Sequence, residues 1–192
     1  RALCAGGAGV AVVEAGGGQE LEVFPADRKD SGLFYEHLQA LQAAWGRPEV
    51  IVVGLGPGSY AGVRIAIATA IGLKAAWGAR LLGLPSICAL NHEEYVASGD
   101  ARRNSFFFAH VVRGDCVQGP TLATADEVRE KLREWQHLPR IAPLPLPQFE
   151  DITVEHPSAL RLAELALTVE SGDAETLAPI YFREPYITTS RK

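Results

Sequence analysis

The segment that most constrains the fold is Val52–Gly78, VVGLGPGSYAGVRIAIATAIGLKAAWG, in which a glycine-rich turn separates a β-branched run from a long apolar stretch. The run Glu49–Gly56 (EVIVVGLG) is continuous, which is typical of a strand that is covered on both faces and lies parallel to its neighbours. The apolar stretch Tyr60–Trp77 predicts a helix. A strand, a turn and a helix in this order indicate an α/β fold with a mixed sheet.

The flanking residues complete a first lobe around this unit. A helix is expected before it, capped by Asp30 or Ser31 and stopped by Gly46, and its apolar residues recur at helical spacing: Phe34, Leu38, Leu41 and Trp45. The other expected elements are two strands of a hairpin, a strand and a short helix: Gly9–Gly17, Glu20–Ala26, Arg80–Ser86 and Ile87–Ala97.

A polar segment, Ser98–Asn104, predicts the boundary between two lobes, residues 1–98 and the smaller residues 99–192. The second lobe should contain a strand, a charged helix, a proline-rich edge strand or connector, and a final helix: 105–112, 125–135, 138–148 and 157–172. The last residues, from Leu177, should be extended.

Composition and charge exclude several classes of protein. With 47% apolar and 21% charged residues, the chain has the balance of a soluble globular protein. Its net charge is −5 and neither half is basic, so we expect no nucleic-acid binding by the chain alone. Charged residues interrupt the apolar stretch and leave runs shorter than the ~18 residues of a membrane span, so we expect no membrane contact. The cysteines, Cys4, Cys88 and Cys116, are odd in number and form no C-x-x-C pair, which favours the reducing cytoplasm over a disulfide framework or zinc site.

The glycine turn matches no phosphate-binding motif in full. A P-loop needs Lys and then Ser or Thr after its last glycine, whereas Val63 and Arg64 follow Gly62. Residues Gly56–Ala61 satisfy G-x-G-x-x-A, but the acid that should bind a ribose ~20 residues later is missing. We therefore expect no cofactor.

The sequence also contains no complete motif for a catalytic serine or for a metal site. Ser59 lies where a hydrolase would place its serine, but Pro57 and Ala61 replace the glycines that such an elbow requires. We expect Ser59 to cap the helix instead. His92-Glu93-Glu94 lacks the second histidine of a zinc helix, so no catalytic or metal residue is assigned. The turn is expected to be structural, with Gly56 and Gly58 adopting glycine-specific angles or close approaches and Pro57 fixing a φ angle.

The helix Tyr60–Trp77 has apolar residues on nearly every side, more than one sheet face can bury. The preceding helix also has apolar residues off its main stripe, such as Leu33, Tyr35 and Ala44. Either the second lobe covers this surplus or the two helices form a subunit interface, which we favour. The residues expected at the interface are Phe34, Leu38, Leu41, Tyr60, Val63, Arg64, Ile67, Ile71 and Lys74.

The stretch from Val52 to Leu90 resembles the G-x-GPGS-[FY]-x-G-[VL]-R-[IL] signature of the bacterial TsaB (YeaZ) family. Asp100-Ala101-Arg102-Arg103 matches the family's D-A-R-R. Pro157-Ser158-Ala159 matches its P-x-A, and Leu177–Arg183 its L-x-P-x-Y-[LF]-R. The matches run from about residue 49 to the end.

The resemblance implies a fold and a function. The family fold has two lobes of the actin-like ATPase, sugar-kinase and heat-shock-chaperone (ASKHA) type. Its members are non-catalytic dimerisation subunits of the complex that makes threonylcarbamoyladenosine in tRNA. This implies binding to a TsaD-like catalytic subunit and a TsaE-like ATPase, contact with tRNA only through the complex, and a homodimer when the partner is absent.

The chain departs from the family at three places. The first strand should end in Asp-Thr-Ser but reads RALCAGGAG, and Asp30-Ser31 replaces a His-Ser pair. Ile141–Leu144 replaces a glycine-rich turn. These departures weaken any catalytic role, since no acid remains there to place magnesium.

Two other functions stay open on the sequence alone, a stand-alone glycoprotease-like hydrolase and a small nucleotide-binding module. Arg102 and Arg103 have two readings as well. They form either a local ion pair with Asp100 where the chain enters the second lobe, which we favour, or a contact to an acidic partner or tRNA.

Overall fold

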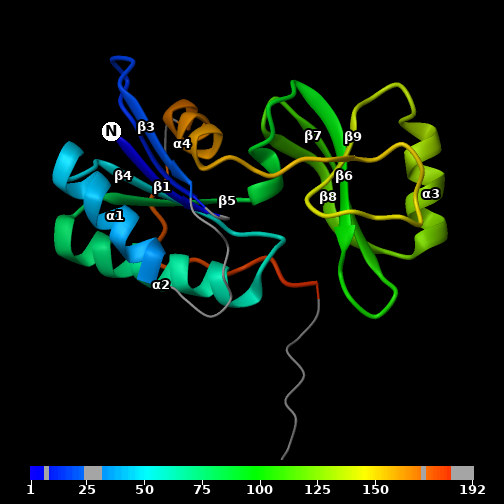
Figure 1. Ribbon diagram of the computed structural model, residues 1–192, viewed down its shortest axis with the longest axis horizontal. Helices are drawn as coiled ribbons and strands as arrows, with labels where there is room; N and C mark the ends of the chain where they lie inside the picture. The colour runs from blue at the N-terminus through cyan, green and yellow to red at the C-terminus, as the bar shows by residue number, and fades with distance from the viewer. Residues whose placement is uncertain (7–8, 24–31, 170–171, 183–192) are drawn as a thin grey trace, which may run out of the picture.

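The computed structural model describes residues 1–6, 9–23, 32–169 and 172–182. Its strands form two five-stranded sheets, in the orders β3-β2-β1-β4-β5 and β10-β9-β6-β7-β8. The first sheet consists of β1 (Ala2–Gly6), β2 (Gly9–Val13), β3 (Gln19–Val23), β4 (Val50–Gly54) and β5 (Arg80–Leu84). The second consists of β6 (Glu94–Asp100), β7 (Phe106–Val112), β8 (Asp115–Ala123), β9 (Arg140–Ala142) and β10 (Thr153–Val154). Each sheet is the centre of one lobe (Figure 1).

The two sheets repeat one topology. In the first, β1, β2 and β3 form an antiparallel meander, β4 pairs in parallel with β1, and β5 pairs in parallel with β4. In the second, β6, β7 and β8 form the meander, β9 pairs in parallel with β6, and β10 pairs in parallel with β9. Strand β9 therefore lies between two strands, whereas the prolines of this segment predicted an edge strand or connector.

Helices cover both faces of the first sheet. Helices α1 (Gly32–Trp45) and α2 (Tyr60–Trp77) pack on one face, over a core that includes Leu41, Ile51 and Val53. Helix α4 (Ala159–Thr168) packs on the other face, over a separate core that includes Val52 and Leu162 (Figure 1). Because β4 contributes side chains to both cores, its continuous β-branched run is explained. Its predicted parallel pairing is confirmed, since it is parallel to both β1 and β5.

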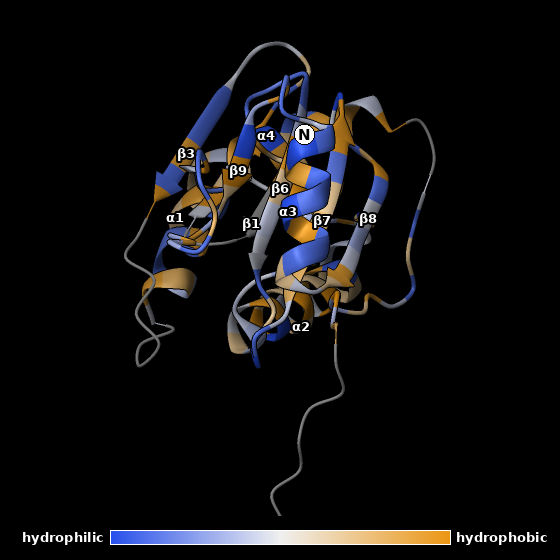
Figure 2. Ribbon diagram, turned by 90° about the vertical axis from the view of Figure 1, so that its right-hand side faces the viewer, coloured by the Kyte–Doolittle hydropathy of each residue, from blue (hydrophilic) through white to orange (hydrophobic). Residues whose placement is uncertain are grey.

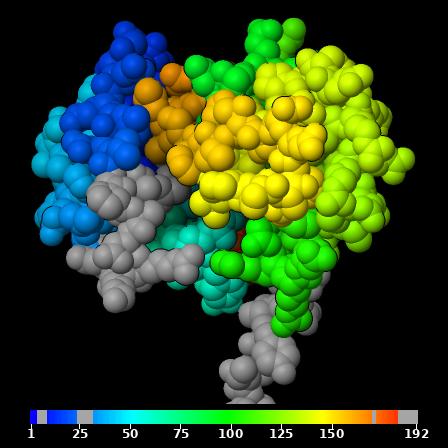
Figure 3. Space-filling model, turned by 45° about the vertical axis from the view of Figure 1, so that its right-hand side comes forward, coloured from blue at the N-terminus to red at the C-terminus, as the bar shows by residue number. Residues whose placement is uncertain are grey.

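The second sheet also buries both faces. Its outer face packs on α3 (Ala125–Glu134) through Phe108, Val128 and Leu132. Polar and apolar residues alternate along α3, which exposes its charged side (Figure 2). The inner face packs on the short helix η1 (Ser86–Cys88) and on Leu165 of α4. Helix α4 therefore lies between the two lobes and contacts both, as the orange atoms in Figure 3 show.

The structure corrects the expected lobe boundary. Residues 87–97 were expected to form a helix, but β6 begins at Glu94 and pairs with β7 and β9. A boundary at residue 98 would cut through this strand, so the second lobe begins near residue 94. The end of the chain was assigned to the second lobe as well, but α4 packs on the first sheet and Ala174 donates its N–H to the Leu81 carbonyl of β5.

Several expected elements are confirmed by the structure, among them the hairpin of β2 and β3 and the helices α1, α2, α3 and α4. Strands β8 and β10 were not predicted, and β1 was expected only from the family resemblance. The expected caps Asp30 and Ser31 and the last ten residues lie outside the described residues. Within the described part of the chain, no helix combines the length and the apolar character that a membrane span requires.

Candidate partner interface

Helix α2 has a capping residue at each end, Ser59 before its first residue and Gly78 after its last. Ser59 is the N-cap, with an extended backbone and a side chain that accepts a hydrogen bond from the Gly62 N–H at 3.3 Å. Gly78 is the C-cap in the left-handed conformation, and its N–H donates to the Lys74 carbonyl. The expectation that Ser59 caps the helix is confirmed.

The turn before α2 is held by three backbone contacts. Gly56 has a φ of 93°, and its N–H donates to Ser86 Oγ at 3.1 Å while its carbonyl accepts from the Ser86 N–H at 2.8 Å. The Ile180 N–H donates to the Leu55 carbonyl at 2.8 Å, which brings the C-terminal segment beside the turn. A Cβ at Gly56 would lie 3.1 Å from the Gly58 nitrogen, so Gly56 needs to be glycine.

Gly58 does not share this requirement, and the expectation for it is wrong. A Cβ built there meets no atom within 4 Å, and its φ is outside the left-handed region. Gly58 is exposed, whereas Gly56 is buried between β4 and the C-terminal segment. The sequence alone shows the same residue at both positions and cannot distinguish them.

We therefore predict unequal effects of one substitution at these two glycines. Gly56→Ala should lower the free energy of unfolding by about 1–3 kcal/mol, because alanine is strained in this conformation. Gly58→Ala should change it by less than about 0.5 kcal/mol. Urea denaturation of both variants measures the difference, and equal losses would contradict it.

One exposed stripe runs along α2. Its members recur at alternating spacings of three and four residues, and all but one are apolar: Ala61, Arg64, Ala68, Ile71 and Ala75. Small exposed residues continue the surface beside the stripe: Gly62, Gly72 and Ala76. At the start of the helix Tyr60 is 42% exposed, and on α1 Tyr35 is 48% exposed. The Thr69 hydroxyl donates to the Tyr35 hydroxyl at 3.4 Å, so the exposed parts of the two helices are continuous. We call the stripe, its small neighbours, Tyr60 and Tyr35 the α1–α2 face.

Five residues expected at the interface lie beneath this face instead. Leu38, Leu41 and Ile67 are 6%, 0% and 7% exposed and belong to the core on the first sheet. Phe34 and Val63 are half-buried against the same core. The sequence predicted that these helices carry surplus apolar residues but not which side faces the sheet. Of the expected set, Tyr60, Arg64 and Ile71 are exposed.

The side chain of Lys74 binds residues of the C-terminal segment of the same chain. Its ammonium group lies 2.5 Å from Asp173 Oδ1 and donates to the Ala174 carbonyl at 3.0 Å. The same carboxylate accepts the Leu81 N–H at 2.9 Å. Hydrogen bonds from Lys74 and then Leu81 lower the pKa of Asp173. Lys74 thus attaches the C-terminal segment to α2 and β5, and it contributes to the face only indirectly.

The C-terminal segment adds an aromatic residue that the sequence analysis did not assign. Tyr181 stacks on Tyr60 with ring centroids 4.9 Å apart, and the Arg64 guanidinium lies 4.7 Å from the centre of the Tyr60 ring. Tyr181 and Tyr60 are 39% and 42% exposed. The L-x-P-x-Y match contained Tyr181, but its spacing gives no indication that it reaches α2.

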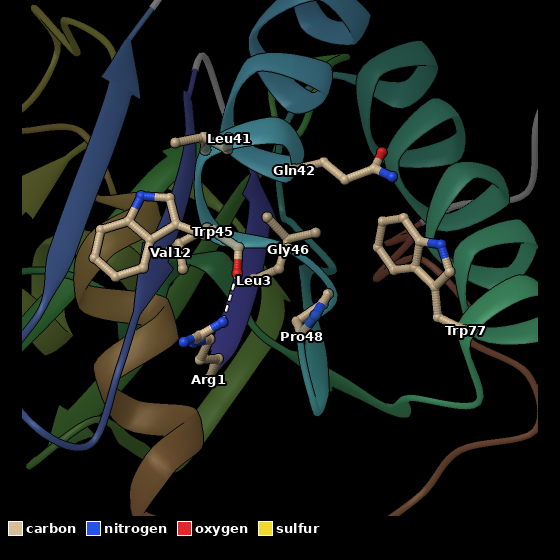
Figure 4. A pocket seen from close by; sticks show the side chains of 9 residues that line it. All are labelled: Arg1, Leu3, Val12, Leu41, Gln42, Trp45, Gly46, Pro48 and Trp77. Atoms are coloured by element: carbon tan, nitrogen blue, oxygen red, sulfur yellow. Dashed lines mark hydrogen bonds between the residues drawn. The ribbon is translucent and has the colours of Figure 1, made fainter.

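At the other end of the two helices is a small cavity (Figure 4). It is lined by Leu41, Gln42 and Trp45 of α1, by Trp77 of α2, and by the first strand with Arg1, which donates to the Trp45 carbonyl at 2.6 Å. Its volume of about 10 Å³ accommodates one water molecule, whereas ligand pockets measure ~300–1,000 Å³.

Charged residues away from the face form local pairs. His37, His92 and His110 lie near Glu22, Glu155 and Glu94 respectively, so these histidines are not directed at Ser59.

Arg102 contacts Asp100 through both its backbone and its side chain. The backbone N–H of Arg102 donates to Asp100 Oδ1 at 2.7 Å, and the Arg102 guanidinium lies 3.9 Å from Asp100 Oδ2. The local ion pair is confirmed for Arg102, but it lies in the turn between β6 and β7 and not where the chain enters the second lobe.

Comparisons with known proteins agree with this architecture. Residues 32–149 match the model of the family TsaD: tRNA N6-adenosine threonylcarbamoyltransferase. No curated protein gives a significant match. Among solved structures, an uncharacterized protein with similarity to peptidase YeaZ from Pseudomonas aeruginosa is 21% identical, with a TM-score of 0.72 over 95% of this chain and 99% of that chain. YeaZ from Pseudomonas aeruginosa is 20% identical, with a TM-score of 0.69 over 94% and 99%.

The family match covers more than half of the chain, and the two structures share its whole fold. The family match and the likeness to the YeaZ structures confirm both the resemblance and the two-lobed ASKHA-type fold class. The chain belongs to the TsaD family and has the fold of the YeaZ (TsaB) proteins that its sequence resembles.

Proposed function

We propose that the chain is a non-catalytic scaffold subunit in tRNA threonylcarbamoyladenosine synthesis. In this role it binds a TsaD-like threonylcarbamoyltransferase through the α1–α2 face and supports a TsaE-like ATPase. It reaches tRNA only within the complex. The family match and the YeaZ-like fold support an association with tRNA modification, and the resemblance of the sequence supports the scaffold role.

The exposed stripe on α2 is the observation that carries the proposal. Alternating spacings of three and four residues align side chains along one side of a helix, which is the arrangement that packs against another helix. The alanines and glycines of this face allow a partner helix to approach the α2 backbone closely. Ile71 and Tyr60 supply apolar area, and Arg64 is the one charged side chain in the stripe. Such a surface suits a partner that also presents apolar helices.

The same surface can pair with its own copy. In a two-fold dimer each α2 stripe meets the stripe of the second chain, and every contact occurs twice. We expect this homodimer when the catalytic partner is absent, and we expect the partner to compete for the same face.

The geometry around Ser59 favours a scaffold over a hydrolase. Its hydroxyl accepts the Gly62 N–H, and the N–H of Gly56 is occupied by Ser86 Oγ. Both groups therefore serve to hold the turn and the start of α2, and His37, His92 and His110 lie beside glutamates instead of Ser59.

Ser59→Ala tests the hydrolase alternative. We expect it to lower the free energy of unfolding by about 0.5–2 kcal/mol, as for other lost N-caps, without changing the rate at which the chain hydrolyses esters or peptides. Thermal melting and hydrolysis assays measure the two effects. Turnover that disappears with Ser59 would establish a hydrolase.

The direct test of the proposal is a pull-down from the lysate of the source cell with the full chain as bait. We expect a TsaD-like protein to co-purify and the isolated chain to form a dimer by light scattering. Measurable ATP affinity in the isolated chain, without co-purification, would favour the nucleotide-binding module.

A further inference from the structure

The structure brings together two cysteines that lie 28 residues apart in the chain. Cys88 ends η1, in the connection between the two lobes, and Cys116 is in β8 at the edge of the second sheet. Their sulfur atoms are 3.3 Å apart, and both thiols are free. A disulfide requires about 2.05 Å, so the two sulfur atoms must approach each other by little more than ~1 Å to form the bond.

The two thiols differ in their surroundings. Cys88 is 2% exposed, in the core that includes Tyr95 and Phe107. Cys116 is half-buried, and it packs against the same core from β8. The hydrogen bond between the two thiols lowers the pKa of Cys116, whereas the same bond and burial raise the pKa of Cys88. Cys116 is therefore the more exposed thiol and the one with the lower pKa, and the buried Cys88 thiol lies beside it.

We propose that Cys88 and Cys116 are a reversible dithiol–disulfide site whose oxidant is a low-molecular-weight disulfide such as glutathione disulfide. The site is independent of the proposed scaffold function, since it rests only on the two sulfur atoms and their environments.

The reaction is an ordinary thiol–disulfide exchange in two steps. The Cys116 thiolate attacks one sulfur of glutathione disulfide, forms a mixed disulfide and releases one glutathione. Cys88 then loses its proton and attacks Cys116 Sγ, which forms the intramolecular bond and releases the second glutathione. Two protein thiols are oxidised and one glutathione disulfide is reduced to two glutathiones.

The bond would connect the lobe junction to the second sheet. Cys88 follows Ser86 closely, and Ser86 holds Gly56 through its side chain and its N–H. Oxidation would therefore fix η1, to which the turn before α2 is attached, against β8. Because the closed loop restricts the unfolded chain, the oxidised protein should melt about 5–10 °C above the reduced protein.

A Cys4→Ser variant tests the proposal, because Cys88 and Cys116 are then its only thiols. The variant is incubated with glutathione disulfide, quenched with acid and alkylated, and its mass is measured. We expect both thiols to be lost together, no glutathione to remain attached, and dithiothreitol to restore both. Two thiols that stay free in excess glutathione disulfide would overturn the proposal, and so would a stable mixed disulfide at Cys116.

Single substitutions in the Cys4→Ser background provide the controls. With Cys88→Ser, Cys116 should retain one glutathione because no second thiol can displace it. With Cys116→Ser, the buried Cys88 should react at least about tenfold more slowly than Cys116 does. Equal reactivity of the two thiols would contradict the assigned order of attack. If Cys88→Ser does not fold, the Cys4→Ser measurement still decides the proposal.

Discussion

Replacing Ile71 with aspartate should weaken association through the α1–α2 face by about 2–5 kcal/mol, which is a loss of about 30-fold or more in affinity. Ile71 is 37% exposed in the middle of the α2 stripe, whereas Ile67, one turn earlier, is 7% exposed and belongs to the core. A partner helix on this stripe would bury the new carboxylate without an opposite charge. The isolated chain should keep its fold, because position 71 is exposed. Light scattering and partner pull-down measure association, and circular dichroism measures the fold.

A matched control separates this effect from any general effect of a new charge. Leu144 is 62% exposed in the connection that follows β9, on the second lobe. Leu144→Asp adds the same charge at an exposed leucine and should leave both dimer and partner binding unchanged. A folded Ile71→Asp protein that still dimerises and still binds its partner would place the interface elsewhere on the chain.

The extent of α2 could be predicted from the sequence because local residues determine it. The serine cap at its start and the glycine after its end act within one turn of the helix. Its orientation could not be predicted in the same way. Residues on nearly every side of α2 are apolar, so periodicity does not identify the buried side. Packing on the first sheet decides that Ile67 is buried and Ile71 is exposed, and the core there includes residues of β1 and α1, which are more distant in sequence than β4 and β5.

The errors in the fold have a related cause. Residues 94–97 alone do not exclude a helix, but pairing with β7 and β9 makes them a strand. Helix α4 was assigned to the second lobe because it follows that lobe in sequence, although its apolar side packs on the first sheet. In both cases a tertiary contact overrides a local or sequential expectation.

The candidate face was predicted in outline and corrected in detail. An excess of apolar residues on two neighbouring helices was visible in the sequence, and Tyr35 was among the residues off the main stripe of α1. Tyr181 could not be assigned, because it reaches Tyr60 only through the path of the C-terminal segment along β5. The approach of Cys88 to Cys116 likewise depends on the packing of η1 against the second sheet.

Replacing Leu41 with alanine should lower the free energy of unfolding by about 2–5 kcal/mol. Leu41 was expected at the interface, but it is fully buried in the core between α1 and the first sheet. Its removal leaves a cavity beneath the α1–α2 face, next to the small cavity that Leu41 already lines. Gln39, exposed on the same helix, provides the control, since Gln39→Ala should change stability by less than about 0.5 kcal/mol.

Urea denaturation measures both changes, and association is then compared at a temperature at which each variant is folded. Under these conditions Leu41→Ala should bind its partner nearly as well as the unmodified chain, because Leu41 supports the face without being part of it. Ile71→Asp should show the opposite pattern, with normal stability and lost association. If Leu41→Ala were as stable as the unmodified chain but failed to associate, Leu41 would belong to the interface and the arrangement of α1 on the sheet would be wrong.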